Sequence, residues 1–120
     1  MQRKHKELRA WQASMRLVKE VYALSASFPK EELFGLASQM RRAAVSVPSN
    51  IAEGSARNGT KELIHFLSIA TGSLSELDTQ LELTKILGYS NDILKIQATL
   101  DETSALTLAL SKSLKSKLKP

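Results

Sequence analysis

The chain has no cysteine among its 120 residues, which excludes disulfides, thiolate metal sites and a cysteine nucleophile and fits a reducing compartment. It has only three prolines and five glycines, so few positions interrupt a helix. It also lacks alternating β-branched segments bounded by turn residues, which strands require. The composition is dominated by Leu, Ala, Ser, Lys and Glu, and it therefore predicts one all-α domain over residues 1–120.

Long apolar runs are missing as well. No uninterrupted apolar segment approaches the ~18 residues that suggest a membrane span. The basic N-terminal residues are not followed by the apolar segment of a signal peptide. We therefore expect a cytoplasmic protein with no membrane association. Its net charge of +5 suggests an anionic partner without specifying one.

Apolar residues at spacings of three and four predict four helices. In the first helix the core seam is expected to include Trp11, Met15 and Tyr22, and a second apolar stripe runs through Leu17 and Val21. Because the connections are short, neighbouring helices are expected to be antiparallel, which gives an up-down-up-down four-helix bundle. The helices are expected over residues 7–27, from 33 or 36 to 55, 61–87 and 92–118, with breaks at Pro29, at Gly54 with Asn58 and Gly59, and at Gly88.

The second predicted helix carries polar residues beside its apolar stripe, and the third offers Ser73 and Glu76, also three residues apart. Polar groups at the edge of a core must find partners. We expect an internal or subunit-interface network in which Arg41 or Arg42 pairs with Glu76. A ligand-binding or catalytic site is the alternative. The predicted network comprises Gln39, Arg41, Arg42, Ser46, Ser49, Asn50, Glu53, Ser73 and Glu76.

Catalytic and metal-binding patterns are weak. Glu53 and Glu76 are a candidate carboxylate pair for acid–base chemistry, but no nucleophile or metal ligand accompanies them. Glu62 and His65 match one Glu-x-x-His motif, whereas a di-metal bundle requires a second copy. We therefore predict no enzyme, no metal site and no cofactor.

The most specific stretch is RAAVSVPSNIAEG at residues 42–54, with Phe28-Pro29 before it and Gly72-Ser73 and Leu87-Gly88-Tyr89 after it. In these motifs the chain resembles the four-helix bundle proteins encoded in intervening sequences of bacterial 23S rRNA genes, and the resemblance covers nearly the whole chain. It implies a left-handed bundle that assembles as a ring-shaped homopentamer, with no established enzymatic activity. Related bundles include the accessory protein of diversity-generating retroelements, which looks like a basic pentamer that binds nucleic acid and a reverse transcriptase.

In the predicted topology both termini and the connection between the second and third helices meet at one end. Ten of the seventeen basic residues gather there, whereas the opposite end is expected to be near neutral. Such a surface favours phosphate backbones, with salt-sensitive and largely sequence-independent binding. The alternative is that the basic tails, about residues 1–6 and 115–120, only solubilise the protein. This basic end comprises Arg3, Lys4, Lys6, Arg9, Arg57, Lys61, Lys112, Lys115, Lys117 and Lys119.

These patterns lead to three functional hypotheses. The first is a non-enzymatic homo-oligomer that binds RNA or DNA through the basic end, without base stacking because Trp11 and Tyr22 are assigned to the core seam. The second is a protein-interaction scaffold or accessory subunit whose anionic partner is an unidentified protein. The third is an enzyme using Arg42, Glu53 and Glu76, which requires these groups to open onto a solvent pocket.

Overall fold

The computed structural model describes residues 4–118, and within this range the chain forms four long helices and no strand. The expectation of an all-α, four-helix protein is therefore confirmed. Two short 3-10 turns, η1 and η2, precede α1 and α2. The elements are η1 (Lys4–Glu7), α1 (Arg9–Ser25), η2 (Lys30–Glu32), α2 (Leu36–Ala56), α3 (Thr60–Ile86) and α4 (Leu94–Lys117).

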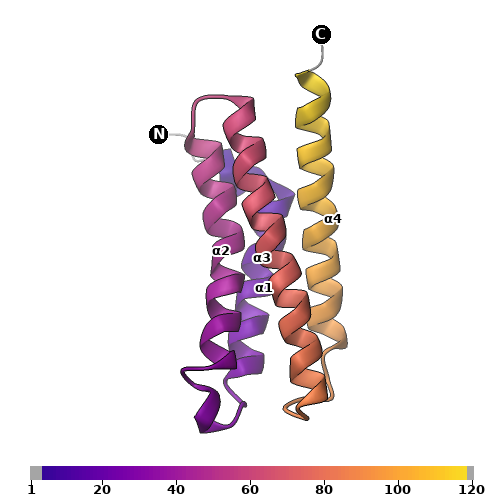
Figure 1. The fold of residues 1–120 in the computed structure, drawn as a ribbon. Helices are drawn as coiled ribbons and strands as arrows, with labels where there is room; N and C mark the ends of the chain where they lie inside the picture. The colour runs from indigo at the N-terminus through magenta and orange to yellow at the C-terminus, as the bar shows by residue number, and fades with distance from the viewer. Residues whose placement is uncertain (1–3, 119–120) are drawn as a thin grey trace.

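The four helices lie side by side in an elongated molecule of 51 × 26 × 19 Å. Successive helices alternate in direction, as Figure 1 shows. α1 packs against α2 and α4, and α3 packs against the same two helices. The two ends of the described chain and the α2–α3 connection therefore meet at one end of the molecule, while the other two connections meet at the opposite end (Figure 1). The left-handed supercoil stays a prediction.

The core forms along apolar stripes on all four helices, and the stripe predicted for α2 is buried throughout. In α1 the predicted main seam was wrong at Met15 and Tyr22, which are 45% and 43% exposed, whereas Trp11 packs against the core. Leu17 and Val21 from the second stripe are fully buried instead. The small side chains of Ala10 and Ala13 lie on that same buried face, where they let α1 approach its neighbours closely.

The buried face of α4 includes three threonines, Thr99, Thr103 and Thr107, in place of large apolar residues. Thr103 and Thr107 are fully buried. Their hydroxyls donate to the Thr99 and Thr103 carbonyl oxygens, each at 2.7 Å. These bonds within the helix satisfy the hydroxyls without a partner from another helix. α4 therefore packs into the core with less apolar surface than a leucine seam would provide.

Gly54 was predicted to help end the second helix, and this prediction was wrong. α2 continues to Ala56, and Gly54 is buried inside it. A Cβ at this position would lie 2.7 Å from the Phe66 Cβ and 3.3 Å from the Leu63 Cα. The glycine therefore allows a close approach of α2 to α3. The turn between the two helices comes from Gly59, whose φ of 131° favours glycine.

At the end opposite the α2–α3 connection, Glu32 joins two connections. Its Oε1 accepts the Leu36 backbone N–H at 3.0 Å, at the start of α2. Its Oε2 accepts the Tyr89 hydroxyl at 2.6 Å. The hydrogen bond from Tyr89, followed by that from the Leu36 amide, lowers the pKa of Glu32, and the same contact with Glu32 raises the pKa of Tyr89. The Phe28 and Tyr89 rings pack at 5.3 Å between centroids.

Replacing Gly54 with alanine tests the close approach of α2 and α3. Because the new methyl group would meet the Phe66 Cβ, G54A should lower the free energy of unfolding by about 1–3 kcal/mol. Gly72 is the matched control, since it is exposed in α3 and a Cβ there would meet nothing within 4 Å. G72A should stabilise the helix by about 0.5–1 kcal/mol. Urea unfolding measures both, and equal effects would contradict the role assigned to Gly54.

Replacing Tyr89 with phenylalanine tests the pH dependence of its bond to Glu32. A lowered folded pKa gives stability above the ordinary glutamate pKa of 4.5, which is lost as the pH falls. The raised pKa of Tyr89 gives stability below its ordinary value of 10.0, which is lost as the pH rises. The difference in Tm between wild type and Y89F should therefore be largest between these values and should shrink outside them.

Thermal unfolding followed by circular dichroism across this pH range measures the difference. Tyr22→Phe is the matched control, since it keeps the ring against which Arg41 packs. A difference for Y89F that does not vary with pH would contradict the assignment.

Candidate nucleic-acid interface

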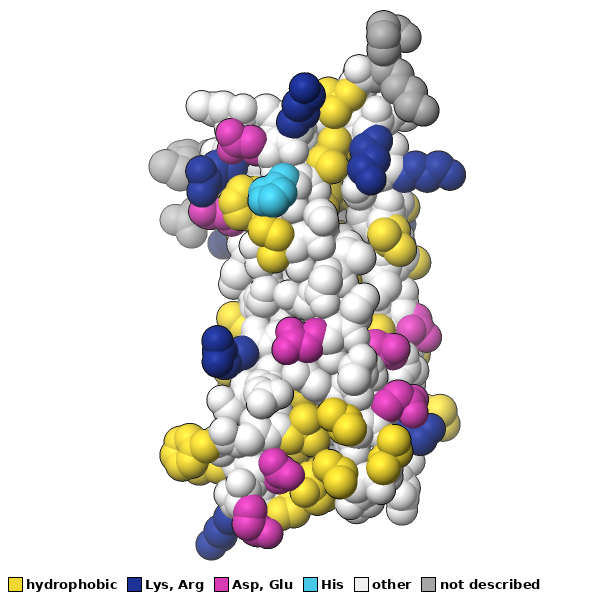
Figure 2. Space-filling view, viewed as in Figure 1, with side chains coloured by type: hydrophobic (Ala, Val, Ile, Leu, Met, Phe, Trp, Pro, Cys, Tyr) yellow, Lys and Arg dark blue, Asp and Glu magenta, His cyan; other side chains and the backbone are white. Residues whose placement is uncertain are grey.

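Three parts of the chain form the basic end: η1 with the first turn of α1, the α2–α3 connection and the last turns of α4 (Figure 1). On the face in Figure 2, lysine and arginine side chains gather at this end. Two residues predicted for this surface, Arg3 and Lys119, lie outside the described residues. The other eight are exposed and belong to this end: Lys4, Lys6, Arg9, Arg57, Lys61, Lys112, Lys115 and Lys117.

The N-terminal part of this surface is held against α1. The Gln12 side-chain amide donates to the Lys6 carbonyl oxygen at 2.9 Å. The His5 ring packs edge-on against Trp11 at 5.3 Å between centroids. Lys4 and Lys6 therefore extend from a turn with fixed contacts rather than from an unattached tail.

Arg57 differs from the lysines of the basic end because a carboxylate neutralises it. Its Nη2 lies 2.7 Å from the Glu53 Oε1, and this hydrogen bond raises the pKa of Arg57. Its guanidinium also lies 5.2 Å from the centre of the Phe66 ring. The other ion pair found among residues 4–118 joins Arg16 and Glu102. The six described lysines of the basic end therefore have no ion-pair partner within that range, and they supply most of its free positive charge.

The predicted pairing of Arg41 or Arg42 with Glu76 was wrong. Arg41 turns toward α1, where its Nε donates to the Ser25 Oγ at 2.8 Å and its guanidinium lies 4.7 Å from the centre of the Tyr22 ring. Arg42 and Glu76 are both exposed, so water solvates each charge and little is gained by pairing them. The Glu76 carboxylate contacts the Gln80 amide at 3.5 Å.

The polar network between α2 and α3 is smaller than predicted. The Ser73 Oγ donates to the Ser46 Oγ at 2.8 Å across the helix interface. The Asn50 Nδ2 donates to the Ser46 Oγ at 2.9 Å and to the Ser46 carbonyl oxygen at 2.8 Å. Gln39 and Ser49 are exposed and lie outside these contacts. The internal network therefore consists of one half-buried trio, and the rest of the predicted stripe is surface.

A shallow hollow of about 420 Å³ lies beside this trio, between α2 and α3. Arg42 and Glu76 line it, but Glu53 does not, since it pairs with Arg57. Of the three residues in the enzyme hypothesis, the structure therefore brings Arg42 and Glu76 together and leaves Glu53 apart. Among the described residues, no histidine lines the hollow to act as a base. Within residues 4–118, no three His, Cys, Asp or Glu side chains are grouped to hold a metal ion.

The family model of the 23S rRNA-intervening sequence protein matches residues 6–109. This range contains α1, α2 and α3 entirely, most of α4, and the run at residues 42–54. The chain belongs to this family. A search of curated proteins found no match. Lys112, Lys115 and Lys117, the lysines that α4 contributes to the basic end, follow the matched range, so that part of the basic end lies beyond what the family match covers.

The structure also shows an exposed aromatic surface that sequence reasoning missed. Tyr22 was assigned to the core seam, but its exposed ring packs against Arg41. Phe34 is 93% exposed in the α1–α2 connection. The sequence signal for its exposure was its position next to Gly35, outside the apolar stripes of the first and second helices.

Among the described residues, no helix combines the length and apolar character that crossing a bilayer requires.

Proposed function

We propose that this member of the 23S rRNA-intervening sequence protein family is a non-enzymatic, homo-oligomeric protein that binds RNA or DNA through its basic end. The observation that carries the proposal is the convergence of exposed lysines from both ends of the chain and from the α2–α3 connection. Only Glu7, Glu53 and Glu62 oppose them there, and Glu53 is already paired with Arg57. Phosphates of either nucleic acid suit unpaired lysines, so binding is electrostatic and largely independent of sequence.

The homopentamer implied by the family resemblance is part of this proposal. The sides of the bundle expose Met15, Leu83 and Leu108, at 45%, 40% and 54%. Apolar side chains on these sides support contacts between copies. In a five-membered ring the basic ends would lie on one rim, and their potentials would add.

Light scattering after size-exclusion chromatography measures the oligomeric state. The expected mass is five times the 13.2 kDa of one chain. A mass of 13.2 kDa would contradict the pentamer, but it would leave nucleic-acid binding by a single basic end open to separate measurement.

Charge reversal tests the basic end directly. The triple variant K61E/K112E/K115E should bind a single-stranded RNA and a duplex DNA of mixed sequence at least tenfold more weakly at about 50 mM salt. The slope of log K against log salt is negative, and its magnitude should decrease for every phosphate that the variant no longer neutralises. The decrease should be about 0.7 for single strands and 0.9 for duplexes. Fluorescence anisotropy against salt measures both quantities.

The triple variant K19E/K30E/K85E is the matched control. It makes the same change in net charge at exposed lysines outside the basic end, and it should keep most of the wild-type affinity. Equal reductions of affinity in the two variants, or no binding by the wild-type protein at about 50 mM salt, would contradict the proposal.

The second candidate, a protein-interaction scaffold, is favoured by a different observation. The end opposite the basic end exposes Phe34, Ile86 and Leu94, each more than three-quarters exposed. Patches of this kind mark interaction with proteins rather than with phosphate backbones.

A further inference from the structure

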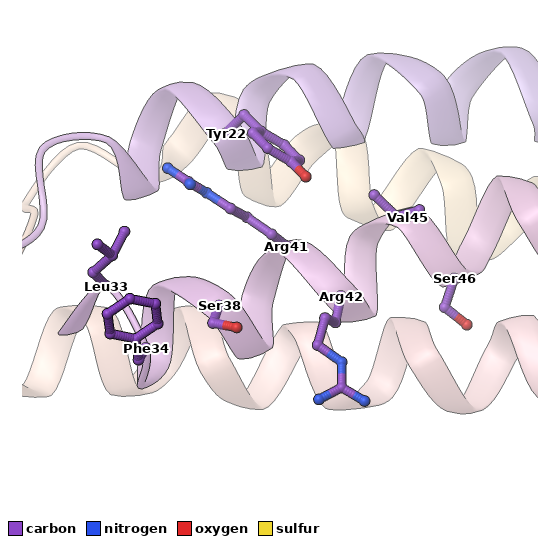
Figure 3. A pocket seen from close by; sticks show the side chains of 8 residues that line it. All are labelled: Tyr22, Leu33, Phe34, Ser38, Arg41, Arg42, Val45 and Ser46. Carbon is purple, nitrogen blue, oxygen red and sulfur yellow. The ribbon is translucent and has the colours of Figure 1, made fainter.

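An apolar groove lies near the end of the molecule opposite the basic end, along α2. It has a volume of about 540 Å³ and is formed by α2 with Tyr22 of α1 and the α1–α2 connection. In Figure 3, Leu33 and Phe34 lie at one end of the groove and Val45 lies farther along α2. The lining residues that matter here are Tyr22, Leu33, Phe34, Arg41, Arg42 and Val45.

Several apolar side chains are exposed at the end of the molecule where the groove lies. Phe34 is 93% exposed and Leu33 is 52% exposed. At the same end of the molecule, Ile86 and Leu94 are 76% and 82% exposed. Figure 2 shows hydrophobic side chains gathered at that end. The bond between Glu32 and Tyr89 fixes the connection that presents Leu33 and Phe34, so this surface is held in place rather than collapsed onto the core.

Two arginines without a carboxylate partner accompany this apolar surface. Neither ion pair found among residues 4–118 involves Arg41 or Arg42. Ser25 and the Tyr22 ring hold the Arg41 guanidinium in position. In Figure 3, Arg41 runs along Tyr22 and Arg42 points to the other side of α2. A bound partner would therefore contact apolar side chains with Arg41 on one side and Arg42 on the other. Acidic side chains complement these two positive charges.

The length of the groove suits a helix. Its α2 residues extend from Ser38 to Ser46, which is about 12 Å along the axis. A helix of about three turns would place apolar residues three and four apart over Phe34, Leu33 and Val45. Acidic residues beside that stripe would reach Arg41 and Arg42.

We propose that this groove docks an acidic amphipathic helix from another protein. Nucleic acid fits less well, since Leu33 and Val45 are aliphatic and Glu31 stands two residues from Leu33 and would repel phosphates. A second copy fits less well, since the main apolar stripes of the long helices lie in their own core, and single exposed side chains such as Met15 and Leu108 do not form the apolar face of an amphipathic helix. This site is separate from the basic end, and together they make the protein an adaptor between a nucleic acid and a protein.

Selection from a phage-displayed library of random peptides tests the proposal on the full chain. Enriched peptides should carry apolar residues spaced three or four apart, with Asp or Glu beside them. A synthetic peptide with the enriched sequence should bind F34S and R42E at least tenfold more weakly than wild type, as expected for an apolar anchor and its flanking charge. Both side chains are exposed, so neither variant should change the Tm.

The matched controls are I69S and K19E, which change an exposed apolar and an exposed basic residue outside the groove. Both should bind the peptide as wild type does. K61E/K112E/K115E should also bind it normally, because the groove is separate from the basic end. This result is expected whether or not the basic end binds nucleic acid. The proposal is overturned if no peptide is enriched, if the enriched peptides are basic, or if F34S and R42E bind them normally. It is also overturned if these variants change the molar mass, which would make the groove a contact between copies, or if they weaken oligonucleotide binding.

Discussion

The close approach of α2 and α3 at Gly54 is the constraint on which the rest of the molecule depends. With no side chain at that position, α2 lies directly against Leu63 and Phe66 near the start of α3. The short connection that follows is thereby held at one end of the bundle. It carries Arg57 onto the Phe66 ring and exposes Lys61. The glycine that closes the run at residues 42–54 thus acts through packing, and the surface charge beyond it depends on that packing.

Sequence periodicity was sufficient for the number of helices and for the buried stripe of α2, because that stripe has no equally apolar competitor on the same helix. In α1 two stripes compete, and apolar character alone did not distinguish Tyr22 from Val21. The choice depends on how neighbouring helices fit against Ala10 and Ala13, which is a property of the assembled bundle. The partner of Arg41 was misassigned for the same reason. Its actual partners, Ser25 and Tyr22, belong to α1, whereas the predicted partner Glu76 belongs to α3.

The basic end was easier to anticipate, because topology alone places both ends of a four-helix up-down bundle next to its central connection. What the sequence did not provide was the distribution of free charge. Glu53 belongs to the same run, residues 42–54, as Ser46 and Asn50. Its carboxylate nevertheless pairs with Arg57 and takes no part in the hydrogen bonds between Ser46 and Asn50. The apolar character of the opposite end was also missed, since it arises from the α1–α2 connection and from the helix ends, where periodicity carries little information.

The buried threonines of α4 affect how the molecule opens. Hydroxyls that bond within their own helix hold α4 to its neighbours less firmly than leucines would, and this favours local opening of α4. Its detachment would withdraw Lys112, Lys115 and Lys117 from the basic end while leaving the contacts of α2 with α1 and α3 intact. If the basic end binds a polyanion as proposed, its retention would depend on the local stability of α4, and the bound polyanion would in turn protect the backbone amides of α4 from exchange with solvent.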